Sequence, residues 1–197
     1  MAEHYYDKDQ KSKLIKTQIN VSFFNKNFKL ITASGIFSVG KIDKGTQILL
    51  NNCIIKDFKK ILDLGCGYGV VGVSIATSFK NCSVLMSDVN KRAIAISKQN
   101  IKLNNLENIK VIQSDCFENI NEKFDFILLN PPQSAGKDIC LKMIEESYNY
   151  LNNNGSLQIV VRKNKGGNTI FNKMKEVFNN IGVLAKKSGY WVCISKK

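Results

Sequence analysis

Short apolar runs alternate with longer amphipathic stretches along the chain after residue 60. The apolar runs are typical of strands buried on both faces, and the stretches between them carry apolar residues at helical spacing. The predicted strands cover residues 61–64, 83–87, 109–113, 124–129, 157–161, 183–185 and 190–194. The predicted helices cover residues 70–79, 91–103, 138–151 and 168–178. This alternation predicts an α/β fold in which helices cover both faces of a mostly parallel sheet.

The end of the chain departs from this alternation. Only residues 186–189 separate the last two predicted strands, and this is too short for the crossover that parallel neighbours need. We therefore predict a Rossmann-like, doubly wound sheet of seven strands that is mostly parallel, with an antiparallel last strand.

A different pattern precedes residue 60. Two strand-like segments, residues 20–24 and 28–33, predict a β-hairpin. A loop with three glycines follows, and Thr46 can cap a short helix that runs to about residue 54. We therefore divide the chain into a small N-terminal extension with the hairpin, residues 1–45, and a main domain, residues 46–197.

A glycine-rich turn, Gly65-Cys66-Gly67-Tyr68-Gly69, lies between the first strand and the first helix of the main domain. Such a turn makes room for a nucleotide-like ligand. Its spacing differs from the G-x-G-x-x-G of dinucleotide sites, and Asp63 just before it repels a pyrophosphate but suits a cationic amine. The turn therefore favours S-adenosylmethionine over NAD as the ligand.

Two further acids, Asp88 and Asp115, end the next two strands. Because the carboxyl ends of parallel strands meet at one edge of a sheet, we expect Asp63, Asp88 and Asp115 to face the same ligand. Asp88 can accept two hydrogen bonds from a ribose diol, and Asp115 can accept one from an adenine amino group. Each acid alone is also an ordinary cap or solvated loop residue, so the indication comes from their succession.

Asn130-Pro131-Pro132 ends the fourth strand. The Asn130 amide oxygen and the Pro131 carbonyl can each accept one hydrogen of an exocyclic ring amine, whose lone pair is otherwise delocalised into the ring. The lone pair is then free to attack a sulfonium methyl group, with in-line positioning as the main source of acceleration. The alternative is a turn that only terminates the strand, since proline ends β-ladders.

Composition narrows the chemistry and the compartment. His4 is the one histidine, and the six cysteines are scattered without a C-x-x-C pair, so we expect neither a metal site nor a histidine base. No apolar run is long enough to span a membrane, and the first 16 residues lack the apolar core of a signal peptide. We therefore expect a cytoplasmic protein with reduced thiols and no membrane partner.

The net charge of +13 is unevenly distributed along the chain. Residues 1–60 carry +6, residues 61–159 carry −1 and residues 160–197 carry +8. Basic flanks around a neutral centre suit a large polyanion such as RNA, although lysine- and asparagine-rich chains also carry such charge for solubility. Only two arginines are present, which favours phosphate contacts by lysine over dense reading of base edges.

These motifs carry a family resemblance. Residues 63–69 resemble the first motif of class I S-adenosylmethionine-dependent methyltransferases, and residues 130–132 resemble their fourth motif in enzymes that methylate exocyclic or amide nitrogens. Residues 34–46 are similar to a stretch of the small-subunit rRNA guanine-N2 methyltransferases, especially their short archaeal-type single-domain relatives. The resemblance covers about residues 28–197. Bacterial members of that family have an additional N-terminal domain, for which this chain is too short.

The resemblance implies an S-adenosylmethionine-dependent enzyme that methylates the N2 amine of guanine in RNA, with small-subunit rRNA or a small-subunit particle as substrate. Asn130 and Pro131 are the implied catalytic residues, and Asn130 also borders the cofactor. The other implied cofactor residues are Asp63 at the amino group, Gly65, Cys66 and Gly67 under the methionyl part, Asp88 at the ribose, Val89 beside the adenine, Asp115 at the adenine amine, and Cys116 behind it.

The substrate side is less fully specified. Many adenine-N6 and glutamine-amide methyltransferases have an aromatic residue after the two prolines, whereas this chain has Gln133, which can hydrogen-bond a base edge. Phe37 is the candidate for stacking on the base, with packing in the hairpin core as an equal alternative. Arg162, with Lys163 beside it, can meet RNA phosphate or simply end a strand in solvent.

Two other functions compete with guanine methylation. One is methylation of adenine N6 in nucleic acid or of a glutamine amide in a protein, and the other is RNA binding by a relict fold without catalysis. The intact glycine turn, the strand-end acids and Asn-Pro-Pro argue against a relict. The sequence fits a monomer or a homodimer.

Overall fold

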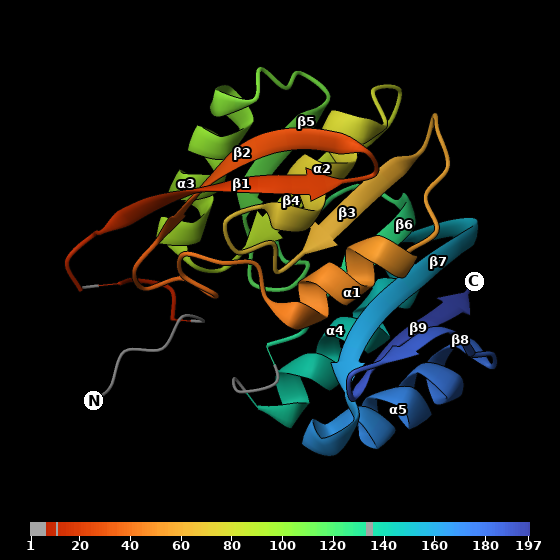
Figure 1. Cartoon of the computed structure of the whole chain (residues 1–197). Helices are drawn as coiled ribbons and strands as arrows, with labels where there is room; N and C mark the ends of the chain where they lie inside the picture. The colour runs from red at the N-terminus through yellow and green to blue at the C-terminus, as the bar shows by residue number, and fades with distance from the viewer. Residues whose placement is uncertain (1–6, 11, 133–135) are drawn as a thin grey trace.

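A seven-stranded sheet forms the centre of the molecule in the computed structural model, which describes residues 7–10, 12–132 and 136–197 (Figure 1). Its strands are β3 (Lys60–Leu64), β4 (Ser83–Asp88), β5 (Ile109–Gln113), β6 (Phe124–Leu129), β7 (Leu151–Arg162), β8 (Gly182–Lys187) and β9 (Tyr190–Lys196). They are arranged in the order β5-β4-β3-β6-β7-β9-β8. Strands β3 to β7 are parallel to one another, and β9 runs antiparallel to both β7 and β8. The mostly parallel sheet with an antiparallel last strand is therefore confirmed.

Helices cover both faces of this sheet. They are α1 (Lys44–Asn52), α2 (Val70–Ser78), α3 (Lys91–Leu103), α4 (Lys137–Tyr150) and α5 (Asn168–Phe178). Alternate strand residues point to opposite faces, so that Ile61 packs in one core with α1, α2 and α3, while Leu62 packs in a second core with α4 and α5. Two separate cores on the two faces account for the buried, nearly continuous apolar runs of the sequence.

The hairpin consists of β1 (Lys16–Phe23) and β2 (Lys26–Ala33), which pair antiparallel over their full lengths. Phe24 and Asn25 form its turn with φ values of 49° and 59°, and positive φ at both central residues is typical of a type I′ hairpin turn. The hairpin is longer than the sequence predicts, because backbone pairing continues through polar residues such as Lys16 that carry no apolar signal. The loop expected at residues 25–27 is correspondingly shorter.

Strand β2 lies against α2 and α3 (Figure 1). The side chain of Asn100 on α3 fastens it there. The Asn100 side chain is fully buried. It accepts a hydrogen bond from the Ile31 N–H at 2.7 Å, and it donates to the Ile31 carbonyl at 2.9 Å and to the Tyr68 carbonyl at 2.8 Å. The Asn100 side chain thus provides hydrogen-bond partners for two backbone groups of β2, and it joins the hairpin to the glycine turn.

The helix predicted with Thr46 as its N-cap begins three residues earlier. Asp43 is the N-cap, and its carboxylate accepts a hydrogen bond from the Thr46 N–H at 3.1 Å. Both residue types cap helices well, but a carboxylate also interacts favourably with the positive end of the helix dipole. The prediction of Thr46 as N-cap was therefore wrong, and Thr46 is a buried residue of the first turn.

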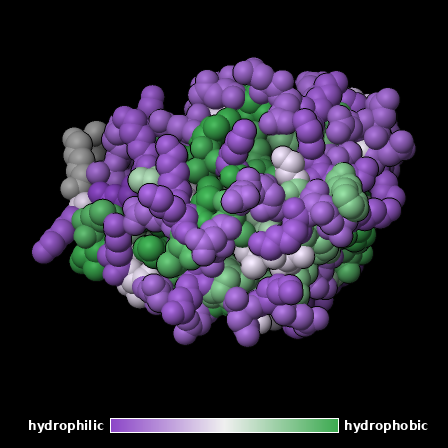
Figure 2. All heavy atoms as spheres, turned by 90° about the horizontal axis from the view of Figure 1, so that it is seen from above, coloured by the Kyte–Doolittle hydropathy of each residue, from purple (hydrophilic) through white to green (hydrophobic). Residues whose placement is uncertain are grey.

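The face of the molecule seen from above is largely polar. Figure 2 shows hydrophilic side chains over most of the face seen from above, with hydrophobic ones confined to smaller patches. Within residues 7–10, 12–132 and 136–197, no helix has the length and apolar character needed to cross a lipid bilayer.

We predict that Asn100→Ala lowers the free energy of unfolding by about 2–4 kcal/mol, because it removes the partner of one buried backbone group, the Tyr68 carbonyl, and of two partly buried ones on Ile31. The control is Asn104→Ala one turn later on α3, whose side chain bonds Lys29 at the outer end of the hairpin and is less buried. We expect the control to cost less than about 1 kcal/mol. Urea unfolding measures both, and equal losses would contradict the proposed role of Asn100.

Candidate active site

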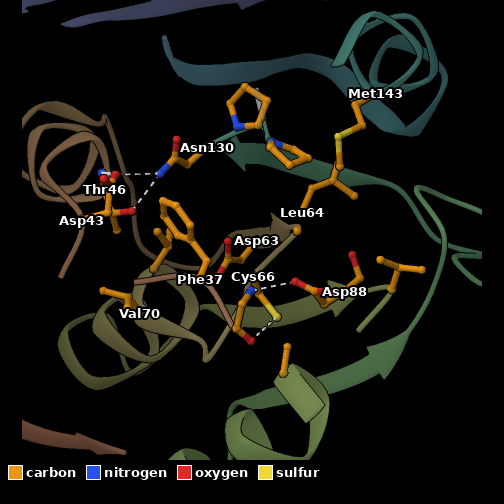
Figure 3. A pocket seen from close by; sticks show the side chains of 18 of the residues that line it. Phe37, Asp43, Thr46, Asp63, Leu64, Cys66, Val70, Asp88, Asn130 and Met143 are labelled. Atoms are coloured by element: carbon orange, nitrogen blue, oxygen red, sulfur yellow. Dashed lines mark hydrogen bonds between the residues drawn. The ribbon is translucent and has the colours of Figure 1, made fainter. Parts of the chain in front are cut away.

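The carboxyl ends of the parallel strands surround one cavity of about 380 Å³ (Figure 3). This volume falls in the range of about 300–1,000 Å³ that is typical of small-molecule sites. The chain forms β3, β4 and β5 in order toward one edge of the sheet and then returns to form β6 on the other side of β3. The cavity lies at this reversal of strand order, where ligands usually bind in such sheets.

Nearly all of the predicted site residues line this cavity. They are Phe37, Asp63, Gly65, Cys66, Gly67, Asp88, Val89, Asp115, Cys116, Asn130, Pro131 and Arg162. Gln133 lies outside the described residues. The structure therefore brings together residues that are spread over more than half of the sequence.

The glycine turn is held in place by hydrogen bonds from neighbouring elements. The Cys66 N–H donates to the Ser87 carbonyl at 2.9 Å, the Gly67 N–H donates to Asp88 Oδ2 at 2.8 Å, and Ser97 Oγ donates to the Gly67 carbonyl at 2.9 Å. Gly67 has a φ of 57°, and a Cβ atom built on it would meet no atom within 4 Å. The turn is therefore a preformed backbone cradle that is open on the cavity side.

Asp63 is a buried carboxyl group at the base of the cavity, with 4% of its surface exposed. Its Oδ2 accepts a hydrogen bond from the Gly72 N–H at 2.8 Å, and it forms no ion pair with a described basic residue. Burial raises the pKa of Asp63 from its ordinary value to about 7, the Gly72 N–H opposes that rise, and the charge of Asp88 adds to it. A buried carboxyl without a cation is suited to receive one.

Asp88 stabilises the cradle and still faces the cavity. One carboxylate oxygen accepts from the Gly67 N–H, and the other accepts from the Asn90 N–H at 2.9 Å. Burial raises the pKa of Asp88, although these backbone N–H groups counteract the rise. Each oxygen has a second lone pair for a ligand hydroxyl. Asp115 is more exposed and lies at the edge of the same cavity.

Asn130 is oriented by two residues from the start of α1 (Figure 3). Its Nδ2 donates to Asp43 Oδ2 at 3.2 Å and to Thr46 Oγ1 at 2.9 Å. Because an ionised carboxylate can only accept hydrogen bonds, the amide must present its NH₂ group to Asp43. The amide oxygen, which accepts no hydrogen bond from the described residues, is left as an acceptor in the cavity.

The loop between β2 and α1 places Phe37 at the cavity. Tyr68 Oη donates to the Lys41 carbonyl at 2.9 Å, and Asn90 Nδ2 donates to the Gly35 carbonyl at 3.1 Å, so both ends of the loop are fastened. Ile36, not Phe37, occupies the core position beside the hairpin, with 4% of its surface exposed. This arrangement favours Phe37 as a ligand contact over the alternative of hairpin packing.

Cys66 and Cys116 are buried, and burial raises the pKa of both thiols, that of Cys116 to about 12. Protonated thiols are poor nucleophiles, which favours the interpretation of both residues as packing positions. Among the described residues, no group of three or more His, Cys, Asp or Glu side chains is placed to hold a metal ion.

Sequence reasoning missed Asp43, Thr46 and Tyr190, which also line the cavity. The three-residue spacing from Asp43 to Thr46 is a capping signal and was available in the sequence. The contact of both residues with Asn130, more than 80 positions later, was not. Tyr190 reaches the cavity from the start of β9, and no local motif marks it.

Comparisons with known proteins agree with this geometry. The family model for the methyltransferase small domain matches residues 27–194. The Bacillus subtilis (strain 168) protein YbxB is 37% identical over 200 residues, which cover the whole of both chains. Ribosomal RNA small subunit methyltransferase C of Psychromonas ingrahamii is 34% identical over 157 residues, covering 77% of this chain and 44% of that protein.

Among solved structures, the T. thermophilus 16S rRNA N2 G1207 methyltransferase (RsmC), in complex with AdoMet and guanosine, matches with a TM-score of 0.82. The sequence identity is 21%, so this match shows the shared fold, and it covers 94% of this chain and 51% of that chain. The chain thus spans about half the length of the rRNA methyltransferases it matches, although it spans the full length of YbxB.

The site is that of a class I S-adenosylmethionine-dependent methyltransferase, as the glycine turn and the strand-end acids predicted. The chain belongs to the methyltransferase small domain family, whose model covers most of its length. The residues present also fit the cofactor: the Gly67 cradle is open toward the cavity, and the buried Asp63 carboxyl has no described cation as partner.

We predict that Asp63→Asn raises the stability of the fold at pH 8 but weakens the binding of S-adenosylmethionine. The folded-state pKa of about 7 lies above the ordinary value of 3.8, so protonated Asp63 stabilises the fold at low pH, and this contribution is lost as the pH rises through 7. At pH 8 the variant should therefore be more stable than the wild type by about 1 kcal/mol or more, with a smaller difference at pH 5. The check is urea unfolding at both pH values.

The same variant should bind S-adenosylmethionine at least about tenfold more weakly, because the cationic amino group loses its carboxylate partner. In the wild type, affinity should fall as the pH is lowered from 8 to 6, since Asp63 becomes protonated. Calorimetric titration measures both effects. A variant that is no more stable at pH 8 and binds the cofactor normally would contradict the assignment.

Proposed function

We propose that this protein methylates the exocyclic N2 amine of a guanine in RNA, with small-subunit rRNA as the substrate class. The observation that carries the proposal is the orientation of Asn130, whose amide nitrogen is held by Asp43 and Thr46 so that its oxygen accepts in the cavity. An acceptor at this point suits a substrate that brings an NH₂ group. The names of the relatives, small subunit methyltransferase C and the N2 G1207 enzyme, support the choice of RNA and of guanine.

When bound, S-adenosylmethionine supplies an electrophilic methyl group on a sulfonium, whose sulfur leaves with the electron pair of the broken C–S bond. Asp63 would hold the cofactor amino group, Asp88 the ribose and Asp115 the adenine amine, with Val89 beside the adenine. The backbone at Gly65, Cys66 and Gly67 would support the methionyl part. Asn130 and Pro131 would then face the substrate.

Asn130 and Pro131 prepare the amine for reaction. The Asn130 amide oxygen and the Pro131 carbonyl each accept one hydrogen of the guanine amine, which favours pyramidal geometry and directs the lone pair away from the ring. The nitrogen then forms its bond to the methyl carbon and afterwards releases one proton to water. A strong base is not needed, because the methylated amine is a much stronger acid than the free amine. Positioning can contribute about 7–11 kcal/mol, and the two hydrogen bonds about 1–3 kcal/mol.

Two neighbours of the cavity suit the base and its backbone. Phe37 provides an aromatic face for the guanine ring, and Arg162 provides a cation for an adjacent phosphate. Adenine N6 and a glutamine amide also carry an NH₂ group and remain the second candidates. Guanine in RNA is favoured by the basic charge around the cavity, described below, and by the named relatives.

The test is transfer of tritiated methyl from S-adenosylmethionine to unmodified rRNA, to small-subunit particles and to a protein extract, followed by digestion and chromatography. We expect the label in N2-methylguanosine, and the comparison of free RNA with particles shows which form is used. Label in adenosine or in protein would overturn the substrate. No label with any of them, despite measurable cofactor binding, would contradict the proposal and favour a domain that binds without catalysis.

We predict that Asn130→Ala lowers kcat at least tenfold and leaves the Kd for S-adenosylmethionine nearly unchanged, because the lost amide oxygen accepts from the substrate amine, whereas Asn130 only borders the cofactor. Asn149→Ala, at an exposed position near the end of α4, is the matched control and should keep full turnover. Steady-state kinetics and calorimetry make the measurement. Unchanged turnover in Asn130→Ala would remove this residue from the mechanism.

A further inference from the structure

Five basic residues form a group beside the entrance of the cavity, which we call the basic rim: Arg162, Lys163, Lys165, Lys186 and Lys187. All five are exposed, and Arg162 and Lys165 line the cavity itself. They come from the end of β7, from the irregular segment η1 (Lys163–Gly167) and from the end of β8. Residues from three different elements thus present positive charge on one side of the site.

Strand register places three of these residues at one edge of the sheet. Arg162 on β7 and Lys187 on β8 both pair with Tyr190 on β9, and Lys186 pairs with the next residue, Trp191. Paired residues point to the same face of a sheet and successive residues to opposite faces, so Arg162 and Lys187 share the face of α1 with Tyr190, whereas Lys186 shares the face of α5 with Trp191. The rim therefore runs around the edge of the sheet where β7 and β8 end, with β9 between them.

The aromatic rings of β9 hold three of these cations. The Arg162 guanidinium lies 5.9 Å from the centre of the Tyr190 ring, and the ammonium groups of Lys163 and Lys186 lie 5.7 Å and 5.4 Å from the centre of the Trp191 ring. Two like charges near one ring repel each other, and an anion bound nearby reduces that repulsion. The charge of this group therefore suits a phosphate.

No described carboxylate neutralises the rim. None of its five residues forms an ion pair with a described acid. Glu176 is the only acid in residues 160–197, and it pairs with Lys173 on α5. The carboxyl groups of Asp63, Asp88 and Asp115 line the cavity at the ends of other strands. Asp43, which flanks Gly45 together with Tyr190, is a fourth carboxyl group of the cavity, and it forms no ion pair with the rim either.

We propose that the basic rim binds the sugar–phosphate backbone of unpaired RNA next to the target base. Lysine-rich, arginine-poor contacts fit phosphate binding without base reading. The RNA is unpaired because an exocyclic amine must leave the base stack to enter the cavity. The proposal rests on the proposed function for the base in the cavity, whereas backbone binding at the rim is measurable without methyl transfer.

The experiment compares two double charge reversals by fluorescence anisotropy with a labelled single-stranded RNA. The rim variant is Lys186→Glu with Lys187→Glu. The matched control is Lys80→Glu with Lys102→Glu, which changes the net charge equally at two exposed positions near the amino ends of the strands. We expect the rim variant to weaken RNA binding at least tenfold and the control to weaken it less than twofold.

The salt dependence provides an independent readout. A single-stranded complex loses about 0.7 in the slope of log K against log salt for each phosphate contact, so the rim variant should have a slope smaller by about 1.4. Thermal unfolding and binding of S-adenosylhomocysteine should stay unchanged, which shows that the fold and cofactor site are intact. If the first pair disturbs folding, Lys163→Glu with Lys165→Glu in η1 tests the same surface.

Three results would overturn this inference. Equal weakening by rim and control variants would mean that overall charge, not the rim, attracts RNA. Unchanged RNA binding in a folded rim variant would place the RNA elsewhere. Tighter binding of a matched duplex than of the single strand would contradict an unpaired ligand. If the rim effect is found but no label enters guanine in the transfer assay, backbone binding stands and the proposed function fails.

Discussion

The chemistry of this site depends on the hydrogen bonds that the carboxylate of Asp43 accepts. Its Oδ2 accepts a hydrogen bond from the Thr46 N–H and so caps α1. The same atom accepts a hydrogen bond from Nδ2 of Asn130, the residue that follows β6. A carboxylate cannot donate, so this contact decides which end of the Asn130 amide faces the cavity. Thr46 Oγ1 accepts the second amide hydrogen and completes the constraint. The start of one helix thereby determines the hydrogen-bonding character of a strand end 87 positions later.

The cavity combines two electrostatic environments on a single sheet edge. Carboxyl groups at the ends of β3 and β4 suit a cationic ligand, because burial raises the pKa of Asp63 and a cation beside it would stabilise its ionised form. The uncompensated cations at the ends of β7 and β8 suit a polyanion instead. Strand β9 lies antiparallel between β7 and β8, so the ends of β7 and β8 lie at the same edge of the sheet. This arrangement places the basic rim at the cavity that Asn130 also lines.

Local patterns predicted the parts of this structure that local sequence determines. The buried strands, the glycine turn and the acids after β3, β4 and β5 follow from apolar runs and strand-end positions, and the shared edge of a parallel sheet brought them together as expected. The N-cap of α1 was predicted to be Thr46, whereas the structure has Asp43 there, and both residue types are favoured at this position. Asn130 contacts Asp43, and Asn100 contacts Ile31, so that single polar side chains join segments that are distant in the sequence. The spacing of hydrophobic residues does not predict such contacts.

A double-mutant cycle between Asp43→Ser and Asn130→Ala is the most direct test of the central claim that Asp43 acts through Asn130. Serine retains an oxygen that can cap α1, but it is too short to hold the Asn130 amide as the carboxylate does. Asp43→Ser should lower kcat severalfold in the wild-type background, with the KM for S-adenosylmethionine unchanged, and should have no further effect when Asn130 is already alanine. If the loss of kcat in the double variant equals the product of the two single losses, Asp43 acts independently of Asn130, and this result would contradict the central claim.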